Sequence, residues 1–298
     1  MTPPSPTPIL PPELEKEIFQ IAASSGPLSI PRLMLVAWRV KTWVEPMLYR
    51  VLVILGGTGG PRGLNGMRGY PFEDDEEFSR IQSIPTSILT ESVRHLFLSG
   101  MPDPVTEFIL SASSGVEDFF YLNFQQHNPS ILDVLGRLSL KRLYCGISTD
   151  IFESVAQVDF SHALFSHITH LELFDQLDVD DTDIWSNLAL IPHLTHLALN
   201  CLSVSLALTL LETCNLLRVL VFMRSSFDDD DESELGKLAR DSRFVQTDCA
   251  EFIKDWQMGA LTGIDYWSRA EDFIMKRMSG EVDRFQYVMK YDESTTLR

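Results

Sequence analysis

Six short segments of the chain repeat one pattern: an apolar residue, two spacers, an apolar residue, one spacer and a third apolar residue. In a strand, successive side chains point to opposite faces. The pattern therefore predicts six strands that bury the middle apolar residue and the residue two places beyond it. The middle residues, which recur at intervals of 23, 24, 28, 26 and 23, are Leu96, Phe119, Leu143, Leu171, Leu197 and Leu220.

The stretches between these strands predict helices, since several of them open with Pro or Ser, as helix starts often do. They begin at Pro104, Pro129 and Ser203. A period in the twenties with an L-x-x-L-x-L core is typical of leucine-rich repeats, in which each coil adds one strand and one helix. No Asn stands five residues after any middle residue. We therefore expect an irregular α/β solenoid over residues 85–249.

The residues that flank each middle residue are expected to line the inner wall of the solenoid. Three neighbouring strands place an aromatic residue there, and exposed aromatic clusters are typical of interaction sites. The sequence leaves open the alternative that a loop or the C-terminal segment covers them. The predicted target-binding residues are Phe97, Phe120, Tyr144, His170, Glu172, Phe174 and His196.

The chain outside the repeats divides by composition. Residues 1–9 are rich in Pro and predict a disordered lead. Residues 10–55 carry apolar residues at helical spacing and predict a small all-helical unit. A Gly-rich and acidic linker is expected at 56–84. Residues 250–298 predict a helical C-terminal cap and tail, in which Trp256, Tyr266 and Trp267 cover the open end of the last coil.

The charge balance is strongly acidic, with 42 Asp and Glu against 24 Lys and Arg and a net charge of −18. This argues against nucleic-acid binding, because neutralising phosphates requires clustered Lys and Arg. It favours a basic protein partner, or serves solubility alone. The acidic runs at 73–77 and 228–234 lack the framework of a calcium loop and predict solvated loops.

Four cysteines occur without any C-x-x-C pair, and the first residues do not resemble a secretory signal. Both observations predict a protein of the cytoplasm or nucleus. The uncharged stretch 184–211 contains Pro192, several His and Asn residues and a repeat strand. It is better explained as a strand and a helix of the solenoid than as a membrane span.

The N-terminal segment ILPPELEKEIF, followed by PRLMLVAWRVKTWVEPMLYRVL, resembles an F-box. It is similar to the F-box-like region of a large group of proteins from mushroom-forming fungi, in which WRVKxWVEPxLYR recurs. The same group carries THLEL-type repeats and a tail similar to residues 243–277. The positions that match the F-box pattern are Leu10, Pro11, Pro12, Glu13, Leu14, Ile18, Leu33, Val36, Trp43, Leu48 and Tyr49.

The resemblance implies a non-catalytic adaptor. In that family the F-box docks on a Skp-family linker, which joins it to a cullin ubiquitin ligase, and the repeats present a target. The residues implied to bind the linker are Leu10, Pro11, Leu14, Ile18, Leu33, Val36, Trp43, Leu48 and Tyr49. Two alternatives stay open: a leucine-rich-repeat scaffold without any ligase link, and a repeat-bearing regulator that assembles with itself.

Nothing in the sequence favours an enzyme, a metal or a cofactor. The nucleophile motif G-x-S-x-G and the zinc motif H-E-x-x-H do not occur. His167 with His170, and His193 with His196, have metal-like spacing. The repeat places only one of each pair on the wall, so we interpret them as ordinary histidines at strand edges.

Overall fold

The computed structural model describes residues 10–55, 70–71, 85–123, 128–176, 181–201, 203–223, 232–248 and 252–290. The predicted lead at 1–9, most of the predicted linker at 56–84 and the acidic run at 73–77 lie outside these residues. So does the first part of the acidic run at 228–234.

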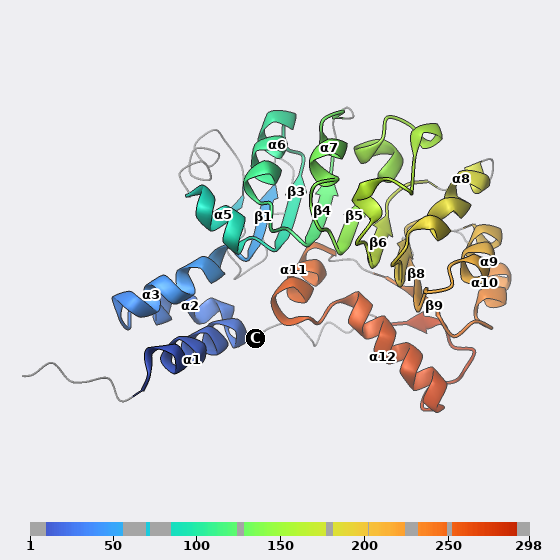
Figure 1. The fold of residues 1–298 in the computed structure, drawn as a ribbon. Coiled ribbons are helices and arrows are strands. Elements are labelled where there is room, and N and C mark those ends of the chain that lie inside the picture. The colour runs from blue at the N-terminus through green and yellow to red at the C-terminus, as the bar shows by residue number, and fades with distance from the viewer. Residues whose placement is uncertain are drawn as a thin grey trace, which may run out of the picture.

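The described part of the chain forms a mixed α/β fold around one parallel sheet (Figure 1). The strand order is β10-β9-β8-β7-β6-β5-β4-β3-β1-β2. The strands are β1 Val51–Leu55, β2 Tyr70–Pro71, β3 His95–Ser99, β4 Asp118–Leu122, β5 Arg142–Cys145, β6 His170–Leu173, β7 His196–Leu199, β8 Val219–Met223, β9 Phe244–Thr247 and β10 Val288–Met289.

The register of the sheet aligns the six repeated segments. Leu96 stands opposite Phe119, which stands opposite Leu143, and the row continues through Leu171 and Leu197 to β8. All six middle residues of the sequence pattern are fully buried. Leu171 and Leu197 thus lie side by side in the adjacent parallel strands β6 and β7.

Helices cover one face of this sheet, which we call the outer face (Figure 1). Their buried side chains, including Ile109 of α6 and Leu210 of α9, form the main core together with the row of middle residues. These helices are α5 Thr86–Ser92, α6 Asp103–Ala112, α7 Ile131–Leu135, α8 Thr182–Ser186, α9 Val204–Thr213 and α10 Glu232–Leu238. Short helical turns at Ile147–Ile151, Val155–Gln157, Ala163–Phe165 and Asn187–Leu190 complete the layer.

The uncharged stretch 184–211 falls into the end of α8, the strand β7 and most of α9. This matches its interpretation as strand plus helix. Among the described residues, the structure contains no helix with the length and apolar character that a membrane crossing requires.

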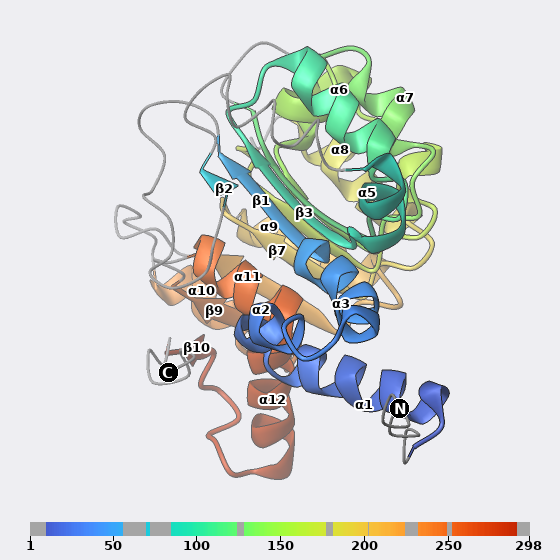
Figure 2. The ribbon, with the colours of Figure 1, turned by 90° about the vertical axis from the view of Figure 1, so that its left-hand side faces the viewer.

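The N-terminal helices form a small unit at one end of the sheet (Figure 2). The helices are α1 Pro12–Ser25, α2 Ile30–Leu33 and α3 Trp38–Val44, and the turn Glu45–Tyr49 leads into β1. A separate small core forms from Ala23, Ile30, Val40 and Val44. α1 begins with Pro12, where the missing N–H costs nothing, and Gly26 follows its last residue.

The helical prediction for residues 10–55 is wrong for its last five residues. Val51–Leu55 forms β1 and pairs with β3 along its whole length. Three of these five residues are β-branched, which favours a strand. The hydrogen bonds to β3 supply the tertiary reason, because Leu52 and Ile54 complete the main core at this end.

The C-terminal segment differs from the predicted cap. β9 and β10 extend the sheet beyond β8. The helices α11 Phe252–Thr262 and α12 Tyr266–Ser279 lie on the face opposite α5 to α9 (Figures 1 and 2). They therefore cover the inner face of the sheet and not the end of the last coil.

Candidate functional site

The inner face of the sheet carries two rows of side chains from neighbouring strands. The first row runs from His95 and Asp118 through Arg142 to His170 and His196. The second row is Phe97, Phe120, Tyr144, Glu172 and Ala198. The first row is polar, with one carboxylate, one guanidinium and three imidazoles, and the second is largely aromatic. Such a face offers partners for hydrogen bonds, ion pairs and stacking.

Three aromatic side chains of α11 and α12 donate hydrogen bonds to these rows. The indole Nε1 of Trp256 donates to Asp118 Oδ1 at 2.8 Å. The Tyr266 hydroxyl donates to Glu172 Oε2 at 2.7 Å. The third donor, Trp267 Nε1, lies 3.1 Å from the Tyr144 hydroxyl oxygen. All three tail residues are buried, so the bonds are shielded from water.

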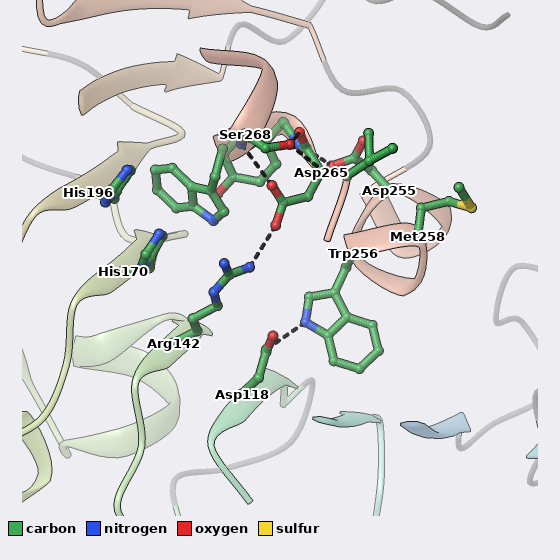
Figure 3. A network of polar contacts seen from close by, with 12 residues as sticks. Asp118, Arg142, His170, His196, Asp255, Trp256, Met258, Asp265 and Ser268 are labelled. Carbon is green, nitrogen blue, oxygen red and sulfur yellow. Dashed lines mark hydrogen bonds and ion pairs between the residues drawn. The ribbon is translucent and has the colours of Figure 1, made fainter. Parts of the chain in front are cut away.

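An ion pair joins the first row to the start of α12 (Figure 3). The Arg142 guanidinium lies 2.6 Å from Asp265 Oδ2. Asp265 is also the N-terminal cap of α12, because its Oδ1 accepts the backbone N–H of Ser268 at 2.8 Å. Gly259 of α11 faces this carboxylate. A Cβ at Gly259 would lie 2.7 Å from Asp265 Cβ, so only glycine permits this approach of the two helices.

The other end of α12 is tied to β9 by a buried guanidinium. Arg277 donates to the backbone oxygens of Phe244 at 2.7 Å and Ala239 at 3.0 Å. The same side chain bonds Arg284 O at 2.9 Å. Gly280, with a φ of 82°, ends the helix in the left-handed conformation that favours glycine. α12 is therefore fixed at both ends.

The two histidines of the first row are stacked on each other. The His170 and His196 rings lie 3.9 Å apart at 6°, and the Trp267 indole meets both edge-on. Burial lowers the pKa of His170 to about 2, with neighbouring His196 and Arg142 acting in the same direction. Burial also lowers the pKa of His196, although Glu271 at 3.1 Å opposes the shift. Both shifts favour the neutral imidazole over the charged one.

A metal site does not form around this pair. Within the described ranges, no three or more His, Cys, Asp and Glu residues are grouped so that they could hold a metal ion. His167 and His193, the other members of the two spaced pairs, are exposed. The buried histidines instead serve the packing of Trp267 against the sheet.

The predicted target-binding residues are thus brought together, but not on an open surface. Phe97, Phe120, Tyr144, Glu172 and His196 are buried, while His170 and Phe174 are partly buried. The sequence left open whether a C-terminal segment covers this wall, and the structure places α11 and α12 there. The polar residues Asp118 and Arg142 of the same rows were not among the predicted site residues. Their signal in the sequence is a charge at the same position of neighbouring strands.

The predicted linker-binding residues divide into two groups. Leu33, Trp43 and Leu48 are partly buried and contact the small core of the N-terminal unit. Tyr49 contacts the main core instead. The exposed group is Leu10, Pro11, Leu14, Ile18 and Val36.

Further apolar side chains extend the exposed group. Ile21 of α1, Leu35 and Trp38 are exposed large apolar residues of the same unit, with Leu35 at 87% and Trp38 at 76%. Leu14, Ile18 and Ile21 follow helical spacing on one side of α1. We call Leu14, Ile18 and Ile21 of α1 together with Leu35, Val36 and Trp38 the N-terminal apolar face. Sequence reasoning missed Leu35 and Trp38 because a helical unit of this size is expected to bury such residues.

Comparison of the chain with protein-family models, with curated proteins and with solved structures found no match in any of the three.

Proposed function

We propose that the protein is a non-catalytic adaptor in which the N-terminal helices are an F-box-like unit and the sheet with its helices is an irregular leucine-rich-repeat solenoid. The N-terminal unit docks on a Skp-family linker and through it on a cullin ubiquitin ligase. The solenoid holds a protein target beside the ligase, in the cytoplasm or nucleus. Such an adaptor needs no chemistry of its own, because tethering raises the local concentration of the target.

The observation that carries this proposal is the N-terminal apolar face. Several large exposed apolar residues on one small unit are typical of an interaction site. Leu14, Ile18 and Val36 belong both to this face and to the residues that the F-box resemblance implies for linker binding. The partly buried Leu33, Trp43 and Leu48 hold the helices together beneath the face.

The covered inner face limits how a target can be held. Phe120 and Tyr144 bind a target directly only when α11 and α12 leave the sheet, because both side chains are now stacked beneath these helices. Otherwise the target contacts the exposed outer surface of the solenoid. A basic target suits either case, given the net charge of −18.

Linker co-purification tests the proposal. The full chain is expected to co-purify with a Skp-family linker, and the double variant Leu14→Asp with Ile18→Asp is expected to reduce recovery at least about tenfold. Placing two charges in a desolvated apolar interface costs several kcal/mol. The matched control is Met275→Asp with Met278→Asp, which changes two exposed apolar residues of α12.

Recovery of linker by the control variant is expected to equal that of the unchanged chain. Equal recovery with the Leu14 and Ile18 variant would contradict the assignment of this face. A chain that never captures the linker would leave the alternative of a leucine-rich-repeat scaffold without any ligase link.

A further inference from the structure

A groove of about 570 Å³ lies between the N-terminal unit and the edge of the sheet where β3 and β4 begin. Figure 2 shows the helices α1 and α3 below β3 and α5 at this edge. The volume of the groove is in the range of pockets that bind ligands. The lining includes the apolar side chains of Trp43 and Met47 and the polar side chains of Lys16, Gln20, Arg50 and Arg94.

The groove is positively charged on a strongly acidic chain. It contains the cations Lys16, Arg50 and Arg94 against the carboxylates Glu91 and Glu117. Of these carboxylates, Glu117 is already paired with Lys141 at 2.6 Å. That hydrogen bond, followed by the charges of Lys141, Arg94 and His95, lowers the pKa of Glu117 despite its partial burial. With Glu117 paired to Lys141, the three cations of the lining face one other carboxylate, Glu91, so the groove favours an anion.

Two of the cations are available to a ligand. Among the residues that the structure describes, the side chains of Lys16 and Arg50 form no hydrogen bond or ion pair. Arg94 uses Nη1 to donate to the backbone oxygens of Val93 and Gly115, both at 3.1 Å. These bonds hold the Arg94 guanidinium at the groove, so its charge is fixed in place.

A buried hydroxyl in the lining points independently to a ligand. Ser92 is only 8% exposed, and its Oγ has no hydrogen-bond partner among the described residues. Buried polar groups are normally paired, so an unpaired one at a cavity wall calls for a partner from outside the chain. Ser92 is the last residue of α5, and it lines the groove together with the cations Lys16, Arg50 and Arg94.

The groove and the N-terminal apolar face lie on different sides of α1. At 100° per residue, Lys16 is about 200° and Gln20 about 240° around the helix from Leu14. Ile18 and Ile21 lie within about 40° of Leu14. One helix thus presents its apolar side to the proposed linker and its polar side to the groove.

We propose that this groove binds an extended acidic peptide segment of a partner protein. Carboxylates of the peptide pair with Lys16 and Arg50, an apolar peptide side chain contacts Trp43 and Met47, and a polar peptide group bonds Ser92 Oγ. The inference goes beyond the adaptor role and does not require linker docking. Charge complementarity selects an acidic segment over a basic one.

Fluorescence anisotropy with the full chain tests the inference. The probe is a short labelled peptide that alternates glutamate and leucine, compared with one that alternates lysine and leucine. We expect saturable binding of the acidic peptide alone, weakened when salt rises from about 50 to 300 mM. The double variant Lys16→Glu with Arg50→Glu is expected to weaken binding at least about tenfold.

The matched control is Arg218→Glu. Arg218 is an exposed cation just before β8, at the same edge of the sheet. Five strand spacings separate β3 from β8 in the sheet order, which is roughly 24 Å and beyond the range of screened charges. The control is expected to change affinity less than about twofold.

Ser92→Ala provides a second readout. Because Ser92 Oγ has no partner in the part of the chain that the structure describes, its removal is expected to leave the thermal midpoint unchanged while weakening peptide binding. The inference is overturned if the acidic peptide does not saturate, if the lysine peptide binds equally well, or if the Lys16 and Arg50 variant binds like the unchanged chain. None of these measurements involves the linker, so they fail independently of the adaptor proposal.

Discussion

Single residues of the inner face show why the sheet and the tail are held in one arrangement. Asp118, Glu172 and Asp265 are all buried, and a buried charge is costly unless it is paired. Each has a donor from across the interface: Trp256, Tyr266 and Arg142 respectively. Removing one of these donors weakens the pairing of a buried carboxylate, although Asp118 keeps a contact with His95 and Asp265 keeps the backbone N–H of Ser268. The pairs therefore act as a specificity device as much as a source of stability.

Glu172 predicts a pH dependence of stability. Burial raises its pKa from 4.5 to about 7, against the hydrogen bond from Tyr266 and in the same direction as the charge of Asp255. The folded chain therefore holds the proton more tightly than the unfolded chain. This stabilisation is complete below the unfolded pKa and is lost as pH rises through 7, by on the order of 3 kcal/mol.

Glu172→Gln removes that loss while keeping an acceptor for Tyr266. The variant is expected to have the higher free energy of unfolding, and the difference is expected to grow from pH 5 to pH 8. At pH 8 it reaches on the order of 3 kcal/mol. His170 changes the stability of the unchanged chain and of the variant in the opposite direction. Because its pKa is lowered in the fold, the folded chain loses stability as pH falls below 6.5. The comparison is therefore made at each pH by urea unfolding.

Glu212→Gln, at an exposed glutamate of α9, is the control for this experiment. Its unfolding curve is expected to follow that of the unchanged chain. Parallel pH profiles for the Glu172 variant and the unchanged chain would mean that Glu172 does not hold its proton in the fold.

At the scale of elements, α12 is fixed by the burial of Trp267. This indole is 1% exposed, packs against the Tyr266 ring at a tilt of 35° and meets the two histidines edge-on. Trp267→Ala is expected to lower the free energy of unfolding by about 3–5 kcal/mol, because it leaves a large cavity and removes a buried hydrogen bond. Hydrogen exchange is expected to show loss of protection first in α12.

Trp38→Ala supplies the matched change at a tryptophan that is 76% exposed. Its effect on unfolding is expected to stay within about 0.5 kcal/mol, because it leaves no cavity. Equal destabilisation by the two substitutions would argue that α12 is only loosely attached to the sheet.

The elements differ in how well the sequence predicts them. Strands β3 to β8 each carry their own apolar pattern, and the helices α6, α7 and α9 begin within a few residues of the expected starts. β1 was missed because a short apolar run such as VLVIL is compatible with helix or strand until its partner is known. β9 has Gln246 where the repeated pattern has its third apolar residue, and β10 is only two residues long. Both strands form because neighbouring strands pair with them.

The covering of the inner face could not be predicted from local pattern. The three aromatic donors and their acceptors are 94 to 138 residues apart in the chain. The sequence did contain both halves of the interaction: charges at one strand position and Trp or Tyr in the tail. Nothing in the sequence states which half meets which, so the sequence leaves open whether Phe97, Phe120 and Tyr144 are exposed or covered. The groove at Lys16 and Arg50 was missed for the same reason.

At the scale of the molecule, the N-terminal unit is continuous with the sheet. The turn Glu45–Tyr49 contacts α5, and Tyr49 packs against the main core. A small cavity of about 30 Å³ is lined jointly by Ala23 and Ile30 of this unit and by Ala260 and Leu261 of α11. The boundary suggested by composition at residue 55 thus cuts through the sheet, and the structural boundary lies before β1.

Two shortened chains test that boundary. A chain that begins at residue 50 keeps β1, whereas one that begins at residue 56 loses it and leaves β3 as an unpaired edge. Exposed edge strands promote association. We expect the first chain to be folded and monomeric with reduced stability, and the second to aggregate, as judged by size-exclusion chromatography and thermal unfolding. Both lack α1 to α3, so neither is expected to capture the linker. Equal monomeric behaviour of the two chains would show that β1 is dispensable and would return the boundary to residue 55.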